Sequence, residues 1–319
     1  MQLYFAPLEG ITNSTYLDAH RRFFDPLNKY YTPFFIPNSQ TGIPRTIRRE
    51  LLLAREADFP LIPQVLTNQS GDFLSAAAAV KCIGCTELNL NLGCPSGTVV
   101  SKGRGAGFLT QRDTLTRFLD EIFSAPPLPI SIKTRIGMEN PEEFPPLLAL
   151  FNQYPISQLT VHPRVRREFY RGSPNLDAFR IATEESRNPL VYSGDLFTPT
   201  QIAGFQQEFP RVEAVMLGRG LIANPALADM ARGGSPLSRE LLASFHDYLY
   251  GRYRELLFGP SPVLHKMKEL WHYMICLFPD HQKALKRLRK AMTLPDYEAA
   301  VTAIFRDLPL DPHSGYYTH

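Results

Sequence analysis

Residues 86–134 contain one strand–helix–strand unit, written as TELNLNL (86–92), DTLTRFLDEIFSA (113–125) and LPISIKT (128–134). The first and third segments are short runs with apolar or β-branched residues, and the middle segment has the length and composition of a helix. A strand followed by a helix and a second strand is the repeating unit of α/β proteins with parallel sheets. The sequence on both sides shows how often this unit recurs.

Six further short runs of strand character flank this unit within the first 220 residues. They are QLYFAP (2–7), KYYTPFF (29–35), PLIPQVL (60–66), ISQLTVH (156–162), PLVYSG (189–194) and EAVMLG (213–218), with the helical segment TPTQIAGFQQEF (198–209) before the last. Eight strands that alternate with helices over this length predict a (β/α)8 TIM barrel, an α/β fold. A doubly wound sheet is the alternative, but no GxGxxG motif follows the first run.

The sequence changes character after Pro225. The segment ARGGSP (231–236) has the composition of a linker, and no strand pattern follows it as far as Arg306. Apolar residues recur there at steps of three and four, as on one face of a helix: Leu264, Met267, Trp271, Met274 and Phe278. These features predict a barrel domain at residues 1–234 and a small C-terminal helical bundle at residues 235–319.

The composition is that of an ordinary globular protein. Hydrophobic residues make up 44% and charged residues 20% of the chain, and no stretch approaches the roughly 18 apolar residues of a membrane span. The first residues lack the basic start and long apolar run of a signal peptide, so we expect a cytoplasmic protein without membrane contact. The net charge of +3 is far below that of a nonspecific nucleic-acid binder, and nothing indicates an obligate protein partner.

The four cysteines are too few and too scattered for a secreted disulfide framework, so we expect thiols. Cys82 and Cys85 form a CxxC pattern, which suits a redox pair, half a zinc site or two small buried side chains. No second CxxC or CxxH segment accompanies it, so we favour the packing role and expect no metal site.

Polar residues follow most of the predicted strands, at the ends where a (β/α)8 barrel carries its active site. They are Glu9, Gln64, Asn91, Cys94, Lys133, Arg135, His162, Ser193, Asp195, Gly218 and Arg219. A single lysine or histidine near a strand end is usually structural. Because eight such ends converge on one mouth, we expect several of these residues to form a binding site.

The stretch LNLNLGCPSGTVVSKGRGAGFL (88–109) is the most specific signal in the chain. Asn91-Leu92-Gly93-Cys94-Pro95, followed by the glycine-rich segment 103–107, resembles the NxGCP signature of the tRNA-dihydrouridine synthases. The resemblance continues in order over roughly the first 225 residues, through APLEGIT (6–12), PQVL (63–66), SIKTRIG (131–137), VHPR (161–164) and LGRG (217–220). It implies an FMN enzyme that uses NADPH, or NADH, to reduce the C5–C6 bond of specific uridines in tRNA to 5,6-dihydrouridine.

The resemblance implies that FMN binds at the strand ends. A phosphate at the end of a barrel typically rests on the loops after strands seven and eight and on a helix N-terminus, where Gly194 and the Gly218-Arg219-Gly220 turn stand. Gln64 and Lys133 suit the amide and cation partners that the pyrimidine edge of an isoalloxazine ring needs. The expected cofactor set is Pro7, Leu8, Glu9, Gln64, Lys133, His162, Ser193, Gly194, Asp195, Gly218 and Arg219.

Cys94 stands in a loop between Gly93 and Pro95, a poor place for a buried packing residue. With an ordinary thiol pKa near ~8.5 it is mostly protonated at pH 7 and suits a general acid. Reduction of a uracil needs a hydride at C6 and a proton at C5, so we expect Cys94 to supply the proton. The expected contacts to the substrate at the barrel mouth are Asn91, Arg135, Arg164 and Arg166.

Basic residues gather in three places: Arg45, Arg48 and Arg49; the segment 164–171; and the segment 283–290. In the last, four cations share one helical face and no acidic residue lies between positions 281 and 290. A charged face is usually only solvated, but an unpaired basic face also suits contacts with a phosphate backbone. We therefore expect tRNA to contact Lys283, Lys286, Arg287 and Lys290.

Four positions depart from the family pattern. Asn89 replaces an aspartate, Pro33 a glutamate, Pro163 a glycine and Ser193 an asparagine. These changes bear on the position of the substrate and on flavin affinity rather than on the fold.

Two other functions stay open. One is an FMN-dependent free-pyrimidine or dihydroorotate-type oxidoreductase on the same barrel, which needs no helical tail with a basic face. The other is a noncatalytic RNA-binding protein that keeps the barrel as a scaffold. The presence of Cys94, Lys133 and Gln64 together argues against this second alternative.

Overall fold

The structure, a computed structural model, describes residues 1–38 and 40–317 and divides into two compact units. The barrel unit comprises Met1–Pro7, Asn28–Gly194 and Phe209–Met216. The helical unit comprises Leu8–Leu27, Asp195–Glu208 and the chain from Leu217 onward. The sequence predicts a domain boundary between residues 234 and 235. Whether residues 1–234 and 235–319 fold independently stays a prediction.

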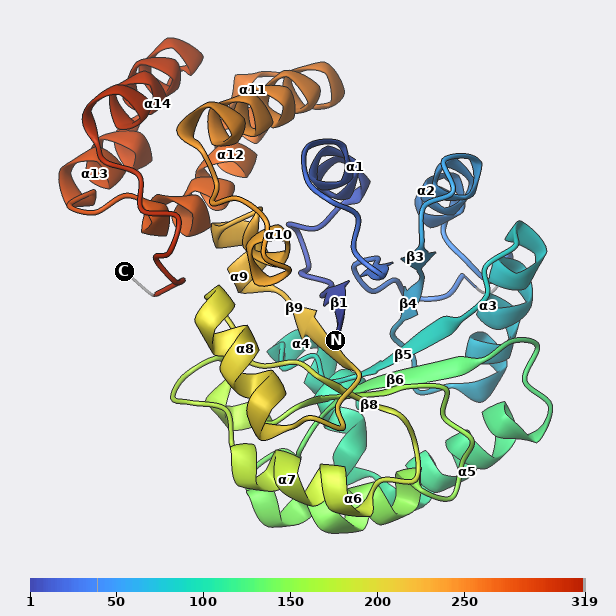
Figure 1. The fold of residues 1–319 in the computed structure, drawn as a ribbon. Helices are drawn as coiled ribbons and strands as arrows, with labels where there is room; N and C mark the ends of the chain where they lie inside the picture. Colours follow the sequence, from blue (N-terminus) through green and yellow to red (C-terminus); the bar gives the residue numbers. More distant parts are fainter. Residues whose placement is uncertain (39, 318–319) are drawn as a thin grey trace. The chain divides into compact units, whose positions relative to one another are not determined.

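The sheet of the barrel unit is parallel and nearly closed (Figure 1). Hydrogen-bonded neighbours follow the order β3-β2-β1-β9-β8-β7-β6-β5-β4 among the described residues. The strands are β1 (Gln2–Phe5), β2 (Lys29–Tyr31), β3 (Leu61–Ile62), β4 (Gln64–Val65), β5 (Leu88–Leu92), β6 (Ile130–Arg135), β7 (Leu159–His162), β8 (Leu190–Tyr192) and β9 (Ala214–Leu217). The (β/α)8 prediction is confirmed, because each of the eight predicted runs contains a strand of this barrel.

The third predicted run appears as two short strands because Pro63 interrupts it. Proline has no N–H group, so it cannot donate to a neighbouring strand. Its carbonyl still accepts from the N–H of Asn89 at 3.0 Å, which keeps β4 in register with β5. On the other side, β3 pairs with β2, so the divided strand links both ends of the sheet order.

Helices cover the outside of this sheet. In Figure 1, α5 (Arg112–Ser124), α6 (Phe144–Phe151) and α7 (Leu176–Glu185) lie along its outer side, and α2 (Arg45–Glu56) and α3 (Ser70–Ile83) cover the first strands. A short helix, α4 (Gly97–Val100), follows the β5 loop. In β5 the leucines alternate with Asn89 and Asn91 and are fully buried, as expected for a strand with helices on one face and the barrel interior on the other.

The helical unit contains α1 (Ser14–Phe23), α8 (Pro199–Glu208), α9 (Arg219–Ala223), α10 (Leu227–Ala231), α11 (Arg239–Leu256), α12 (Pro260–Met274), α13 (Gln282–Lys290) and α14 (Leu294–Asp307). The predicted apolar stripe is confirmed, because all five of its residues are buried on and just after α12. At the centre of the bundle, the Tyr297 hydroxyl lies 2.6 Å from His246 Nε2 and accepts from Trp271 Nε1 at 3.0 Å. Helix α1 packs with α11, where the Tyr16 and Phe245 rings meet edge to face.

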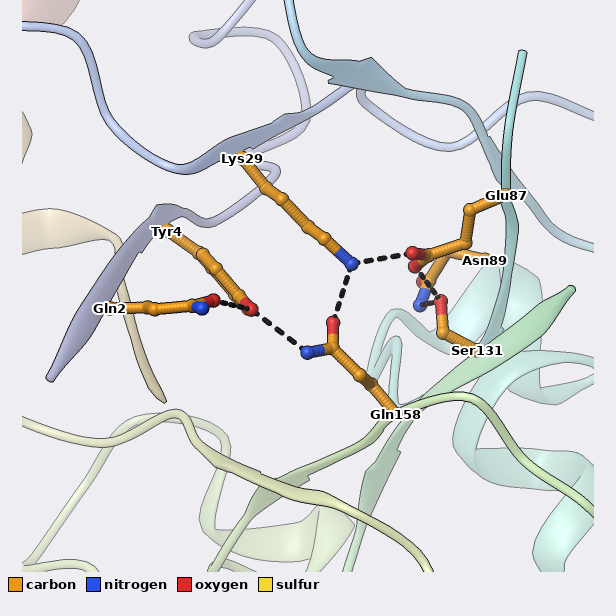
Figure 2. A network of polar contacts seen from close by, with 7 residues as sticks. All are labelled: Gln2, Tyr4, Lys29, Glu87, Asn89, Ser131 and Gln158. Carbon is orange, nitrogen blue, oxygen red and sulfur yellow. Dashed lines mark hydrogen bonds and ion pairs between the residues drawn. The ribbon is translucent and has the colours of Figure 1, made fainter. Parts of the chain in front are cut away.

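A polar network fills the barrel at the N-terminal ends of the strands (Figure 2). Lys29 Nζ donates to Glu87 Oε2 at 2.5 Å and to Gln158 Oε1 at 2.7 Å. Ser131 Oγ donates to the other Glu87 oxygen at 2.5 Å, and Gln158 Nε2 donates to the Tyr4 hydroxyl at 2.8 Å. The Glu87 side chain is only 8% exposed, so Lys29 and Ser131 together compensate for a carboxylate that is nearly removed from water.

Lys29→Met should destabilise the protein by about 2 kcal/mol or more, because it leaves the buried Glu87 carboxylate without its cation. The double variant Lys29→Met/Glu87→Gln should lose less, since it removes both charges. Denaturant unfolding of the two variants measures this difference.

The control is Arg252→Ala, which breaks an exposed ion pair with Glu255 and should change stability by less than about 0.5 kcal/mol. A double variant that is no more stable than Lys29→Met would show that the charge pair is not what the barrel interior requires.

Candidate active site

The polar residues at the C-terminal ends of β4 to β7 face the same interior. Register pairs Gln64 with Asn89, Asn91 with Lys133 and Arg135 with His162. Paired residues in adjacent strands project to the same face, and residues two apart in one strand do so as well. The six residues therefore lie on one face of the sheet. All of them except Asn89 are predicted site residues, and their contact with a cofactor or substrate stays a prediction.

Asn91 is a clamp for the loop that carries Cys94. Its Oδ1 accepts from the backbone N–H groups of Gly93 at 3.0 Å and Cys94 at 2.9 Å. Its Nδ2 donates to Gln64 Oε1 at 2.8 Å, and Gln64 Nε2 donates to Asn89 Oδ1 at 2.7 Å. The expected contact of Asn91 with a substrate stays a prediction, and this geometry adds a second role, which is to hold the Cys94 backbone in place.

The glycine-rich segment 103–107 supports the same loop from the other side. The Cys94 carbonyl accepts from the N–H of Ala106 at 3.1 Å. Gly105 has φ +55°, and a Cβ atom there would lie 2.9 Å from the Cys94 carbonyl oxygen. Only glycine tolerates both the left-handed backbone and this close approach. The second half of the motif is thus needed to shape the Cys94 loop, and the thiol lies half-buried within it.

Lys133 is a half-buried cation within the barrel unit. Burial lowers the pKa of Lys133 to about 8, the charge of Arg135 lowers it further, and Cys94 opposes the shift. Neither a hydrogen bond nor an ion pair joins its side chain to any of the described residues. A cation held in this way, without a counter-charge from the protein, fits a ligand that carries or develops negative charge at that point.

Arg135 and Arg164 use their donors to shape the loop after β7. Arg135 is 2% exposed and donates to three carbonyl oxygens, those of Gly93 at 3.0 Å, Val165 at 3.0 Å and Phe169 at 2.7 Å. Arg164 is fully buried and donates to the carbonyls of Arg171 and Gly172. The donors named here are thus used for backbone carbonyls. Contact of the two arginines with a substrate stays a prediction.

Arg166 is half-buried and joins the two loops after β5 and β7. Its Nε donates to the Pro95 carbonyl at 3.1 Å, and its guanidinium lies 4.9 Å from the centre of the Phe169 ring. His162, at the end of β7, is 7% exposed and lies 3.4 Å from Arg164 Nη1. Pro163, which follows it, accepts from the N–H of Asn175 through its carbonyl, a bond that a proline can still make.

Two aromatic residues that the sequence analysis did not select stand exposed on this loop. Phe169 is 40% and Tyr170 52% exposed, and Phe169 has φ +52°, a strained value for a residue with a side chain. The Tyr170 ring lies 6.1 Å from His162 and 5.4 Å from the Arg135 guanidinium. The sequence did contain a signal for them, because two consecutive aromatic residues stand within the basic segment 164–171 that follows a strand.

The predicted phosphate residues fall in both units. In the barrel unit, Ser193 is 6% exposed and its N–H donates to Val161, and the Tyr192 side chain leaves no room for a Cβ on Gly194. In the helical unit, Arg219 Nη2 donates to Asp195 Oδ1 at 2.5 Å. Gly218 directly precedes α9, which has only five residues, so the arginine rather than the helix is the principal group for an anion.

The loop after β1 is held by α12. Lys266 on this helix donates to the Gly10 carbonyl and to Glu269. Burial raises the pKa of Glu9, and the charge of Lys266 opposes this rise. Pro7 belongs to the barrel unit, whereas Leu8 opens a tight turn in which its carbonyl accepts from Ile11. Contact of Pro7, Leu8 and Glu9 with a cofactor stays a prediction.

The four predicted cations of α13 line one hollow of about 510 Å³ on the helical unit, together with Ala291, Asp296 and Ala299. Leu285 and Leu288 on the opposite face of the same helix are buried, which turns the basic face outward. Asp296 is the acidic residue among those that line the hollow. The charge of the hollow is therefore dominated by the four cations, Lys283, Lys286, Arg287 and Lys290.

Residues 4–297 match the family model described as dihydrouridine synthase (Dus). This chain belongs to the dihydrouridine synthase family. It is 24% identical over 228 residues to tRNA-dihydrouridine synthase B of Pasteurella multocida (strain Pm70), an alignment that covers 71% of this chain and 67% of that protein. It is 28% identical over 217 residues to a probable tRNA-dihydrouridine synthase of Rhizobium leguminosarum bv. phaseoli, with 66% of each chain covered.

A third relative aligns with a longer part of this member of the Dus family. A probable tRNA-dihydrouridine synthase of Staphylococcus aureus (strain Mu50 / ATCC 700699) is 25% identical over 261 residues, covering 78% of this chain and 77% of that protein. Among solved structures, the fold resembles the old yellow enzyme from Trypanosoma cruzi, with a TM-score of 0.53 and 11% identity over 74% of this chain and 89% of that one. It also resembles a 2-naphthoyl-CoA reductase complex, with a TM-score of 0.57 and 9% identity over 73% of this chain and 50% of that one.

The structure corrects one expectation about the CxxC pair of this Dus protein. Cys82 is exposed and therefore does not pack as a buried side chain, whereas Cys85 is half-buried, and burial raises its pKa to about 11, so its thiol stays protonated. In the described chain, no three His, Cys, Asp or Glu side chains gather as metal ligands. None of the described helices is long and apolar enough to span a membrane.

Lys133→Met should stabilise the ligand-free Dus protein at pH 7. The folded pKa of Lys133, about 8, lies below its ordinary value of 10.5, so the charged form weakens folding. This penalty is fully present below pH 8 and disappears as pH rises towards 10.5. The stability difference between variant and wild type, measured by denaturant unfolding from pH 7 to 10, should shrink over that range, and Lys81→Met offers an exposed-lysine control. A variant that is less stable at pH 7 would contradict the view of Lys133 as an uncompensated charge.

Proposed function

We propose that this Dus protein is an FMN-dependent tRNA-dihydrouridine synthase that reduces the C5–C6 bond of uridines in tRNA with NADPH as the reductant. The observation that carries the proposal is the Cys94 loop. A thiol is displayed at the C-terminal end of β5 by the Asn91 clamp, in the barrel interior that also contains Lys133. The family to which the chain belongs supports the reaction class.

Two groups of residues fit FMN. Lys133 and Gln64 are a cation and an amide on the interior face of the barrel unit, and the cation has no counter-charge from the described protein. They would contact the pyrimidine edge of the isoalloxazine ring. In the helical unit, taken by itself, Asp195 orients the Arg219 guanidinium, a group whose geometry suits a phosphate. Bound FMN would supply the hydride for C6 of the uracil.

The protein's own task in the reaction is to deliver one proton. The C5=C6 double bond gains a hydride at C6 and a proton at C5, and the Cys94 thiol gives up that proton from Sγ. The resulting thiolate recovers a proton from solvent, since Cys94 is not fully buried. A uracil stacked within folded RNA cannot enter a barrel, so the base has to leave its stack, which costs a few kcal/mol and less in a loop.

The basic face of α13 supports RNA rather than a free pyrimidine as the substrate. A free pyrimidine or dihydroorotate needs no hollow lined by four cations in a separate helical unit. A polyanion such as RNA binds more tightly for each of these four cations, because each phosphate contact releases counterions. A cytoplasmic location follows from a tRNA substrate and belongs to the proposal.

The experiment that tests the function is incubation of the flavin-loaded protein with unmodified tRNA and NADPH, followed by mass spectrometry of the RNA nucleosides. We expect a gain of two hydrogens at uridine. If the protein leaves tRNA unchanged but reduces free uracil or converts dihydroorotate, the result would favour the alternative oxidoreductase.

Cys94→Ala should lower dihydrouridine formation by ~10² or more, the usual contribution of a positioned general acid. Flavin content and reduction of the flavin by NADPH should stay at the wild-type level, because the thiol acts only on the uracil. Stopped-flow absorbance separates these two half-reactions, and Cys82→Ala, which changes an exposed thiol, is the control. Reoxidation of Cys94→Ala by tRNA at the wild-type rate would rule out proton donation by this residue.

Neutralising Lys283, Lys286, Arg287 and Lys290 together to Gln should weaken tRNA binding and flatten its salt dependence. Each lost phosphate contact lowers the slope of log affinity against log salt by about 0.7 to 0.9. Folding stability should barely change, since exposed cations contribute little to it. Binding is measured at two or more salt concentrations.

The control is Arg180→Gln/Arg306→Gln, which removes cations that pair with neighbouring aspartates and should leave the slope unchanged. An equal slope in wild type and the α13 variant would mean that this face does not contact the RNA.

A further inference from the structure

Arg219 is enclosed by one carboxylate and two aromatic rings of the helical unit. Besides its ion pair with Asp195, its guanidinium carbon lies 5.4 Å from the centre of the Phe197 ring and 5.3 Å from that of Tyr316. The two rings meet at an interplanar angle of 69° with centres 5.4 Å apart. The Arg219 side chain is 13% exposed, so most of its surface is covered by these neighbours.

One of these rings comes from the end of the chain, nearly a hundred residues after Arg219. Tyr316 is 9% exposed and packs in a small core with Ala223 and Cys276. Its ring also stacks on Tyr273 of α12, with centres 5.3 Å apart and an angle of 26°. Tyr316 is therefore a fixed part of the helical unit.

The backbone of the tail is anchored at several points. The N–H of Asp311 donates to the Leu277 carbonyl at 2.8 Å, and Asn224 Nδ2 donates to the Pro312 carbonyl at 2.8 Å. The Cys276 thiol donates to the carbonyl of the last described residue, Tyr317, at 3.4 Å. These bonds hold residues 311–317, which we call the tail strap, along the helical unit.

Gly315 lets the tail strap approach the segment that carries the Phe197 ring. A Cβ atom at this position would lie 3.3 Å from Phe197 Cβ and 3.2 Å from Thr198 Cγ2. Contacts of this kind are tight for a side chain, whereas glycine lets the two backbones approach. The close approach places Tyr316 beside Phe197, with Arg219 in contact with both.

We propose that the tail strap is a positioning device for the flavin phosphate: Tyr316, together with Phe197 and Asp195, fixes Arg219 in the orientation that binds the phosphate of FMN. This inference rests on the proposed function. An arginine side chain has many rotamers, and ordering it on binding opposes affinity. A guanidinium already held over two rings and paired with a carboxylate has lost that freedom beforehand, so less affinity is lost when the phosphate binds.

The charge state of the strap suits this task. Burial raises the pKa of Tyr316, while the positive charge of Arg219 opposes the rise. The phenol is therefore neutral at pH 7 and does not compete with a phosphate for the guanidinium as an anion would. Asp195 is the anionic partner within the group, and its Oδ1 accepts from Arg219 Nη2. A guanidinium presents its five N–H donors in a fixed fork, a geometry that matches phosphate oxygens.

Tyr316→Ala should weaken FMN binding about tenfold and leave riboflavin binding unchanged, since riboflavin lacks the phosphate. The full chain is freed of flavin, and both affinities are measured by flavin fluorescence. Phe197→Leu disturbs the guanidinium from the other ring and should give the same FMN-selective loss. Tyr316→Phe keeps the ring and should restore the wild-type ratio of the two affinities.

The matched control is Tyr317→Ala, which changes the neighbouring tyrosine. Tyr317 is 45% exposed, and its ring lies 6.0 Å from that of His281 rather than against Arg219, so FMN affinity should stay at the wild-type level. Equal losses of FMN and riboflavin in Tyr316→Ala would show that the ring only supports the fold and would overturn the inference. Undiminished FMN affinity in both Tyr316→Ala and Phe197→Leu would overturn it as well. A wild-type protein that binds neither flavin would instead refute the proposed function, and the inference with it.

Discussion

The carboxylate of Glu87 inside the barrel is the interaction on which the rest of the site depends. A carboxylate only accepts hydrogen bonds, so the groups around it have to donate. Ser131 donates to it at 2.5 Å, which leaves the serine oxygen to accept from Asn89 Nδ2 at 2.8 Å. Asn89 then presents its carbonyl oxygen to Gln64, and Gln64 presents its own to Asn91. Each amide is oriented by the one before it. At the end of the series Asn91 has only its oxygen to offer to the Cys94 loop, where two N–H groups need an acceptor.

This directionality accounts for the asparagine at position 89, where the resemblance to the family implies an aspartate. A carboxylate at position 89 could accept from Gln64 but could not donate to Ser131, whose own hydrogen is given to Glu87. It would also place a second negative charge near Glu87 in a region shielded from water, which is costly unless one carboxylate is protonated. An asparagine at position 89 therefore fits the hydrogen bonds of Ser131 and Glu87, which an aspartate would not. The departure at this position is thus explained by its neighbours in the barrel interior.

The barrel and the position of its mouth were predictable because they follow from periodicity and from strand ends. The alternation in LNLNL directs leucines to one face and asparagines to the other, and the same period of two brings Gln64, Lys133 and His162 to the interior. The uses of the long side chains were not predictable. Whether Arg135 reaches a substrate or the carbonyls of Val165 and Phe169 depends on the path of a loop, which no local pattern encodes. The contact of Tyr316 with Arg219 joins segments nearly a hundred residues apart, and it likewise leaves no signature in either segment.

The two ends of the barrel differ in how their charged groups are compensated. At the N-terminal ends of the strands, Lys29 donates to both Glu87 and Gln158, so the buried carboxylate has a cation beside it. At the C-terminal ends, Lys133 has a pKa lowered to about 8 by burial, and Phe169 keeps a positive φ. Both features oppose folding, and neither improves the packing of the barrel. Features of this kind persist when the surrounding structure enforces them and a bound molecule makes use of them. Here the enforcing groups are Asn91, which holds the Cys94 loop, and Arg135, which holds the Phe169 loop through the carbonyl of the strained residue itself. The C-terminal ends of the strands thus hold an uncompensated cation and an exposed, strained loop in an arrangement that suits a ligand.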